Sequence, residues 1–370
     1  MRHGRWLSPW KDSLERPAIY HCVSRVVDRR FVLGDVEREK FRTFMRMQEN
    51  FTGCRVLSYC IMSNHFHILL EVPPLPEGGL SDGELLRRLS FIYGEMAVAA
   101  VAQELTEARR AGNLAHVQEI HARHLYRMHD LSQFMKTLLQ RFTRWFNNCK
   151  KRKGHLWEER FKSVIVEDGS AARTMAAYID LNPVRAGMVQ DPAHYRWSSY
   201  GEAMGGGAKG RGKKAREGLV RAFFGMKSQH GGQQTVAATP EAQWTEVAGQ
   251  YRRLMGLNLA RKPGHARVSV ARKDKLRRAR MTQNSEELMA AGNNATLLAD
   301  ISRAGMLLCR VRYFTDGAVI GSRVFVNEAF DAARERFSAK RKDGARRMKG
   351  SAAAAASVLW SARDLRQGAG

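Results

Sequence analysis

The stretch "YCIMSNHFHILLEV" at residues 59–72 decides the fold. Two apolar runs, "CRVLSYCIMS" and "HFHILLEV", meet at a break around Ser63 and Asn64, and this pattern predicts an antiparallel hairpin. Side chains two residues apart on a strand project from the same face, with their Cα atoms roughly 6.6 Å apart. His65 and His67 therefore share one face of the second strand, whereas Phe66 points into the opposite, apolar layer.

The segments around the hairpin predict one α+β unit. Residues 18–27 ("AIYHCVSRVV") and 160–168 ("RFKSVIVED") predict two further strands, because they are rich in apolar and β-branched residues. Residues 35–51 predict a helix, and another helix begins at Ser170. Residues 80–150 have helical character almost throughout. The predicted order is β-α-β-β-(helical insert)-β-α, an antiparallel sheet with helices on one face.

The charge of the chain favours a polyanionic partner. The 62 Lys and Arg residues exceed the 36 Asp and Glu residues, which gives a formal net charge of +26. Neutralising phosphates releases their counterions and drives binding, although a basic surface can also serve solubility alone. Five cysteines without a CxxC pair argue against a disulfide framework and a cysteine-bound zinc. With no signal-peptide pattern and no long apolar run, we expect a cytoplasmic protein.

Composition predicts a domain boundary near residue 200. Residues 1–200 have a net charge of +8 and hold the elements above, including a helical insert at about 75–130. Residues 201–238 begin with "GEAMGGGAKGRGKKAREG" and predict a flexible basic linker. Residues 239–370 predict a basic, mainly helical region. A recognition-type helix at 321–337 would suit accessory DNA binding there.

A second motif bears on the two histidines. In "AAYIDLNPVRAGMV", Tyr178 and Asn182 are four residues apart and share one face of a helix. Taken separately, the histidines suit a chance pair on a strand, and Tyr178 and Asn182 suit a packed ring and a C-cap. Together the two motifs offer two imidazoles, an amide oxygen and a phenol. That set can bind a divalent metal and attack a phosphate.

Five segments occur in the order found in one known family: "YHCVSR", "YCIMSNHFHILLEV", "GHLWEERFKS", "YIDLNPVRAGMV" and "YRWSSY". Over roughly residues 15–200 the chain resembles the single-tyrosine HUH transposases, also called IS200-like, and most of all their REP-associated tyrosine transposase branch. The resemblance implies a ferredoxin-like sheet that carries the HUH strand. It makes His65 and His67 metal ligands and Tyr178 the nucleophile. Asn182 takes the third metal-ligand position, which many relatives fill with glutamine.

The activity implied by this resemblance is cleavage and rejoining of single-stranded DNA near hairpins. With Mg²⁺ or Mn²⁺ as cofactor, Tyr178 would form a 5′-phosphotyrosine and release a 3′-OH. Three other classes stay open: a domesticated, non-catalytic DNA-binding protein, a replication-initiator or relaxase-type nuclease, and a metal-independent RNA-binding module. Both a monomer and a homodimer are compatible with the sequence.

Basic residues near aromatic ones predict the DNA contacts. The turn at 150–153 precedes Trp157, and this combination suits neutralising phosphates and stacking bases. A solvated loop is the alternative for the turn, and a core or sheet-edge position is the alternative for Trp157 and Arg160. Arg25 and Arg185 match motif positions in the family, but they also suit structural ion pairs. The candidate DNA contacts are Arg25, Lys150, Lys151, Arg152, Lys153, Trp157, Arg160 and Arg185.

Overall fold

The predicted hairpin forms one edge of a sheet. The computed structural model describes residues 5–205, 212–225, 240–256, 307, 314–315, 317–348 and 358–362. β2 (Arg55–Ile61) pairs antiparallel with β3 (His65–Val72), and β1 (Ala18–Arg25) lies between β3 and β4 (Lys162–Val166). The order β2-β3-β1-β4 is that of a ferredoxin-like sheet, which the resemblance implies, and the α+β class is confirmed.

Helices cover both faces of this sheet, whereas the sequence analysis placed them on one face. α1 (Asp35–Thr52) and α5 (Leu131–Cys149) cover the face into which Phe66 points, and the Phe66 ring contacts Phe41 of α1. α6 (Ser170–Asp180) covers the opposite face. The difference arises because the β-α-β-β-α-β core supplies the first helical layer and the chain after β4 supplies the second.

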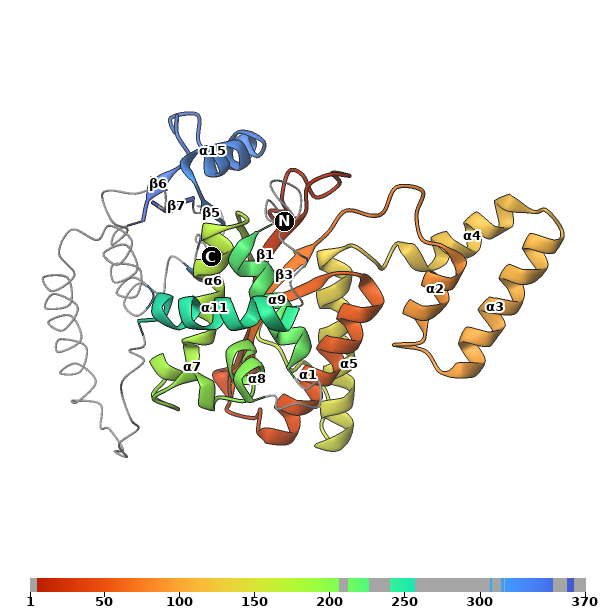
Figure 1. The fold of residues 1–370 in the computed structure, drawn as a ribbon, viewed down its shortest axis with the longest axis horizontal. Coiled ribbons are helices and arrows are strands. Elements are labelled where there is room, and N and C mark those ends of the chain that lie inside the picture. The colour runs from red at the N-terminus through yellow and green to blue at the C-terminus, as the bar shows by residue number, and fades with distance from the viewer. Residues whose placement is uncertain are drawn as a thin grey trace, which may run out of the picture.

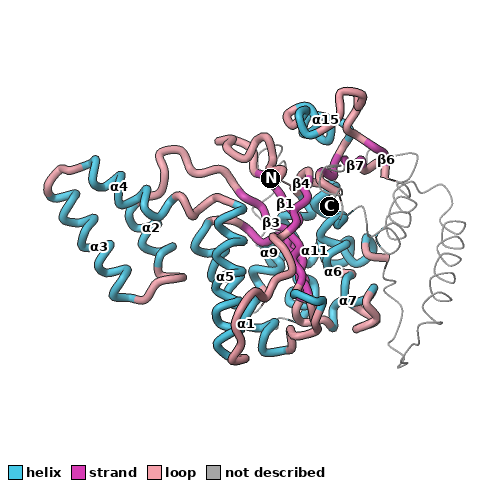
Figure 2. The backbone as a smooth tube through the Cα atoms, turned by 180° about the vertical axis from the view of Figure 1, so that it is seen from behind, coloured by secondary structure: helices cyan, strands magenta, loops and turns pink. Residues whose placement is uncertain are grey.

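Further helices after α6 thicken this second layer. They pack around β2 and α6. Figure 1 and Figure 2 show α7, α9 and α11 near α6. Their bounds are α7 (Asn182–Arg185), α8 (Ser199–Gly205), α9 (Lys213–Phe224) and α11 (Pro240–Leu254).

α9 lies inside residues 201–238, for which composition predicted a flexible linker. Its backbone packs closely on β2, because a Cβ at Gly218 would lie 2.4 Å from the carbonyl oxygen of Val56. Arg221 of the same helix forms an ion pair at 2.6 Å with Glu71, a side chain of β3 with no exposed surface. Glycine and basic residues here serve close packing and a buried ion pair, which composition alone does not distinguish from a linker.

The predicted helical insert projects from the sheet between β3 and α5 (Figure 1). It consists of α2 (Asp82–Leu89), α3 (Glu95–Arg110) and α4 (Leu114–Leu125). Their buried side chains form a second hydrophobic cluster, which includes Phe51 of α1. The insert is therefore packed on the core through α1.

The C-terminal region adds strands to the same sheet, whereas the sequence predicted a mainly helical region. β5 (Val319–Gly321) pairs parallel with β4, and β7 (Trp360–Ala362) and β6 (Arg346–Arg347) continue the sheet in antiparallel pairing. The predicted recognition-type helix is α15 (Arg323–Asp331), which buries Phe325 against Trp10. Most of the predicted helical stretch from 257 to 316 lies outside the described residues. Short 3₁₀ helices are η1 (Val27–Arg29), η2 (Pro192–His194) and η3 (Arg334–Arg336).

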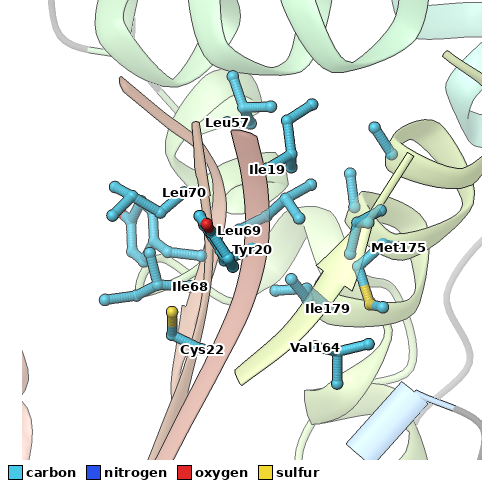
Figure 3. Packing of buried hydrophobic residues seen from close by; sticks show 14 of the residues in the cluster. Ile19, Tyr20, Cys22, Leu57, Ile68, Leu69, Leu70, Val164, Met175 and Ile179 are labelled. Atoms are coloured by element: carbon cyan, nitrogen blue, oxygen red, sulfur yellow. The ribbon is translucent and has the colours of Figure 1, made fainter. Parts of the chain in front are cut away.

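Apolar side chains make up much of the core under α6. Figure 3 shows side chains of β1, β3 and β4 beside Met175 and Ile179 of α6. This packing holds α6 against the strand face that carries the two predicted histidines. In the described ranges, no helix combines the length and the apolar character needed to cross a bilayer.

Candidate active site

β3 presents His65 and His67 on one face, as the alternation of the sequence predicts. The two ring centroids lie 5.1 Å apart, and His67 is only 2% exposed. On the other face, Phe66 packs against Phe41 and Trp157, with ring centroids 4.7 and 5.4 Å away. These apolar contacts hold β3 in the orientation that directs both histidines toward α6.

A third histidine, which the sequence analysis missed, joins this pair. His21 of β1 has no exposed surface. Val23 pairs with His67 across the two strands, so His21 is a diagonal neighbour of His67 on the same face. His21 Nε2 lies 2.9 Å from His67 Nδ1, and His21 Nδ1 lies 2.9 Å from the carbonyl oxygen of Phe314. The sequence signal was its place in the strand "YHCVSR", but strand register cannot be read there.

Asn64 contacts His65 in a comparable way. Asn64 Oδ1 lies 2.7 Å from His65 Nδ1, and Asn64 Nδ2 donates a hydrogen bond to the carbonyl oxygen of Arg29 at 3.0 Å. Arg29 has a left-handed backbone with φ of 54°, which is uncommon for a residue with a side chain. The sequence predicted only a break between strands at Asn64. The structure shows that it also ties His65 to the loop after β1.

Burial keeps the three imidazoles neutral. It lowers the pKa of His21 to about 4. Burial, helped by the positive charges of Arg25 and Arg185, lowers the pKa of His65 to about 4. Burial and the neighbouring imidazoles hold the pKa of His67 well below its usual range. Neutral imidazole has a nitrogen lone pair, and this is the form that binds metals.

α6 places Tyr178 against the histidines. The centroid of its ring lies 6.0 Å from those of both His21 and His67. The same ring stacks on Phe314 at 4.3 Å, and the guanidinium carbon of Arg185 lies 4.1 Å from its centroid. Tyr178 has no exposed surface. The structure thus brings together the predicted nucleophile and the predicted histidines in an enclosed position.

Asn182 is the first residue of α7, one helical turn after Tyr178. Its Nδ2 donates hydrogen bonds to the carbonyl oxygens of Tyr178 at 3.3 Å and Ile179 at 3.0 Å. The amide nitrogen is therefore committed to the helix, and Oδ1 is the end that can act as a ligand. Two neutral imidazoles and an amide oxygen are a donor set that fits Mn²⁺ and, through the oxygen, Mg²⁺.

The sequence predicted Asn182 as the third protein ligand beside the two histidines. Among the residues that the structure describes, no group of three His, Cys, Asp or Glu side chains is placed to hold a metal ion.

Exposed basic residues surround the end of β3 at which His65 lies. Arg25 pairs with His65 across β1 and β3, and it is exposed. The turn after α5 lies beside Arg25, because the Glu158 N–H donates to the Arg25 carbonyl oxygen at 2.8 Å. The exposed basic residues of this turn are Lys150, Lys151, Lys153 and Arg160.

Two predicted DNA contacts are half-buried and contact other groups of the protein. The indole of Trp157 packs against Phe66 and Phe142, with ring centroids 5.4 and 5.9 Å away. Arg185 donates hydrogen bonds to the carbonyl oxygens of Tyr178 at 2.9 Å and Leu307 at 3.1 Å. These contacts favour the structural alternative for both side chains.

Two further candidates have protein partners at the surface. Lys150 forms an ion pair with Glu37 at 2.8 Å. Arg152 donates a hydrogen bond to the carbonyl oxygen of His155 at 2.9 Å. Both contacts shape the basic turn.

Comparison with known proteins finds one family and one solved structure that are similar to this chain. Residues 16–77 match the family described as "Transposase IS200 like". A solved structure titled "Structure of the REP associates tyrosine transposase bound to a REP hairpin" is similar over 56% of this chain and 86% of that chain, with 12% identity and a TM-score of 0.34. No curated protein matches the chain significantly. The matched segment carries β1, α1, β2 and β3 with both predicted metal-binding histidines, and over these residues the chain is similar to the IS200-like transposases.

Proposed function

We propose that the protein cleaves and rejoins single-stranded DNA, with Tyr178 as the nucleophile and Mg²⁺ or Mn²⁺ bound by His65, His67 and Asn182. The observation that carries the proposal is the position of the Tyr178 ring, 6.0 Å from that of His67, although the two residues lie on elements far apart in the chain. A phenol beside neutral imidazoles is an arrangement that suits metal-assisted attack on a phosphate.

The proposed metal ligands are of two kinds. His65 and His67 contribute imidazole nitrogens, and Asn182 contributes Oδ1, a harder oxygen donor. When bound there, a divalent cation supplies Lewis-acid polarisation of the scissile phosphate. Three protein donors leave coordination positions for phosphate oxygens.

Tyr178 carries the covalent step in this proposal. Its Oη attacks the phosphorus atom, and the bond between phosphorus and the 3′ oxygen breaks. The products are a 5′-phosphotyrosine and a free 3′-OH, because the phenolic proton leaves to solvent and the departing oxygen takes one up. The positive charge of Arg185, 4.1 Å from the ring centroid, favours negative charge on the phenol oxygen. Attack by another 3′-OH reverses the step and joins strands without ATP.

The proposed substrate is single-stranded DNA near a hairpin. The net charge of +26 favours a polyanion. Arg25 and the exposed lysines of the turn after α5 lie at the His65 end of β3, where they would neutralise backbone phosphates. The hairpin follows from the resemblance of the five sequence segments to the REP-associated branch.

Attack requires that Tyr178 become accessible. Its side chain has no exposed surface, and Phe314 stacks on its ring. A phosphate therefore reaches Oη only after part of this enclosure moves, and we propose that Phe314 is the part that moves. In the proposed cycle, DNA binding and displacement of Phe314 accompany each other.

Covalent capture of DNA tests the proposal. The purified protein is incubated with 5′- and 3′-labelled hairpin-containing single strands and Mg²⁺ or Mn²⁺, and adducts are resolved under denaturing conditions. Wild type is expected to retain the strand 3′ of the cleavage site. Tyr178→Phe is expected to retain none, whereas Tyr126→Phe, which changes an exposed tyrosine of the insert, is expected to match wild type.

Absence of an adduct with either metal, or an equal adduct with Tyr178→Phe, would contradict the assignment of the nucleophile. The burial of Tyr178 favours one alternative, a non-catalytic DNA-binding protein. Hairpin binding without any adduct, including after removal of the Phe314 ring, would support that alternative.

A further inference from the structure

We propose that Asn64 and His21 are positioning residues that hold the proton of each metal-binding imidazole on Nδ1, so that His65 and His67 both offer Nε2 to the cation. This inference rests on the proposed role of the two histidines as metal ligands. A neutral imidazole carries hydrogen on only one of its two nitrogens. The direction of the hydrogen bond at Nδ1 shows which nitrogen that is.

The direction of the bonds around His67 follows from the carbonyl of Phe314. A carbonyl oxygen only accepts, so the 2.9 Å contact with His21 Nδ1 requires a hydrogen on that nitrogen. His21 is fully buried and has no carboxylate hydrogen-bond partner in the described part of the chain, so a doubly protonated ring would be costly. Its Nε2 is then an acceptor. His67 Nδ1, 2.9 Å away, must be the donor.

His65 also carries its hydrogen on Nδ1, and here the partner is Asn64. Asn64 Nδ2 donates to the carbonyl oxygen of Arg29 at 3.0 Å, which fixes the orientation of the Asn64 amide. Asn64 Oδ1 therefore faces His65 Nδ1 at 2.7 Å, and it can only accept. His65 must donate from Nδ1, and its lone pair lies on Nε2.

Two independent partners, His21 and Asn64, thus hold both imidazoles in the same tautomer, with hydrogen on Nδ1 and the lone pair on Nε2. Hydrogen-bond partners of metal-binding histidines fix the tautomer and the ring orientation, and losing one costs about 10–100-fold in metal affinity or activity. The arrangement also connects the site to two distant segments. Asn64 reaches the loop after β1 at Arg29, and His21 reaches the C-terminal region at Phe314.

Nitrogen NMR of the metal-free protein reads the tautomers directly. The protein is labelled with ¹⁵N-histidine, and long-range ¹H–¹⁵N correlations report which ring nitrogen carries hydrogen. The resonances are assigned with His65→Gln and His67→Gln. Wild type is expected to show hydrogen on Nδ1 for both residues. His21→Leu should change only the His67 pattern, and Asn64→Leu should change only the His65 pattern.

Mn²⁺ binding, followed by the EPR signal of free Mn²⁺, supplies the second readout. His21→Leu and Asn64→Leu are each expected to weaken binding by about 10–100-fold. His21→Gln keeps an acceptor for His67, and Asn64→Asp keeps an acceptor for His65, so both should restore most of the affinity and the Nδ1–H pattern. If a leucine variant does not fold, the His21→Gln and Asn64→Asp variants still test whether an acceptor at each position is sufficient.

Hydrogen on Nε2 of either histidine in wild type would overturn the inference, as would unchanged tautomers and affinity in both leucine variants. The proposed function fails differently. If wild type shows both Nδ1–H tautomers but binds no Mn²⁺, the placement of the two protons stands and the metal role falls. If Mn²⁺ binds equally to wild type and both leucine variants, the metal role stands and the positioning assignment falls.

Discussion

Phe314 stacks on Tyr178, with ring centroids 4.3 Å apart and ring planes 18° from parallel. Leu307, also in the C-terminal region, accepts a hydrogen bond from Arg185, whose guanidinium lies over the same tyrosine ring. The C-terminal region therefore encloses the proposed nucleophile. Sequence composition assigned this region an accessory role, but its contacts lie at the centre of the candidate site.

Removal of the Phe314 ring is expected to accelerate formation of the DNA adduct. An aromatic pair of this kind contributes about 0.5–1.5 kcal/mol beyond buried area. Phe314→Ala should therefore raise the single-turnover rate of adduct formation by roughly 2–10-fold, because 1.4 kcal/mol corresponds to a factor of ten. The rate is measured with labelled hairpin DNA at saturating protein.

The control for this variant is Phe325→Ala. Phe325 is also a buried phenylalanine of the C-terminal region, but its ring packs on Trp10. The Phe325→Ala variant should be less stable than wild type, but it should form the adduct no faster. Equal rates for Phe314→Ala and wild type would show that the stacked ring does not limit access to Tyr178.

Asp180 should make stability fall as pH rises. Burial raises the pKa of this carboxyl to about 7, although it accepts hydrogen bonds from the Tyr200 N–H and the Tyr251 hydroxyl. Between pH 4 and 7 the folded state then holds a proton that the unfolded chain has lost, so the free energy of unfolding decreases across this window. Asp180→Asn should match wild type near pH 4 and exceed it by a few kcal/mol at about pH 8.

Urea unfolding of the metal-free protein at a series of pH values checks this difference. Asp191→Asn is the matched control with the opposite sign. Burial opposes ionisation of Asp191, but hydrogen bonds from Arg252 lower its pKa overall. Its asparagine variant should therefore lose stability at neutral pH and match wild type in acid. A stability difference between Asp180→Asn and wild type that does not change with pH would contradict the assignment.

The exposed lysines of the turn after α5 should contribute salt-dependent DNA affinity. The double variant Lys151→Gln and Lys153→Gln is expected to weaken hairpin binding and to reduce the slope of log affinity against log salt by about 1.4, since each single-strand phosphate contact contributes about 0.7. Fluorescence anisotropy over a series of KCl concentrations measures both quantities. Changing Arg110 and Arg123 of the insert to Gln removes the same charge elsewhere and should leave the slope closer to wild type. Equal slopes in both double variants would place the DNA elsewhere.

Arg221 should be essential for stability, although it lies in a segment predicted to be a linker. It pairs at 2.6 Å with Glu71, which has no exposed surface, and at 2.8 Å with Asp168. Arg221→Leu is expected to cost about 3–5 kcal/mol, because it leaves a buried carboxylate short of a partner. Lys213→Leu on the same helix removes only an exposed contact at 3.9 Å and should cost at most about 1 kcal/mol. Equal urea midpoints for the two variants would favour an undocked linker.

Features that depend on neighbours along the chain could be predicted from the sequence. The shared face of His65 and His67 follows from the alternation of a strand, and the pairing of Tyr178 with Asn182 follows from helical periodicity. The hairpin break at Ser63 and Asn64 likewise marks the turn between β2 and β3. These local rules paired the candidates within each motif, whereas their proposed roles as ligands and nucleophile followed from the resemblance to the family.

Features that depend on register and on distant segments could not be predicted. His21 meets His67 because of the pairing between β1 and β3, and one-residue shifts in register are invisible in either strand alone. Phe314 reaches Tyr178 from a distant part of the chain, and no local pattern predicts such a contact. β5, β6 and β7 have two or three residues each, too few to show alternation. Trp157 suited stacking and packing equally well until its neighbours were known.

Mass spectrometry of the covalent adduct tests the central claim most directly. After reaction with hairpin DNA and nuclease trimming, trypsin releases residues 174–185, "TMAAYIDLNPVR", in which Tyr178 is the only tyrosine. The proposed mechanism predicts this peptide with a 5′-linked nucleotide on Tyr178, dependent on Mg²⁺ or Mn²⁺ and lost in His67→Ala. A nucleotide attached to any other residue, or an unmodified peptide from protein that has cleaved the DNA, would contradict it.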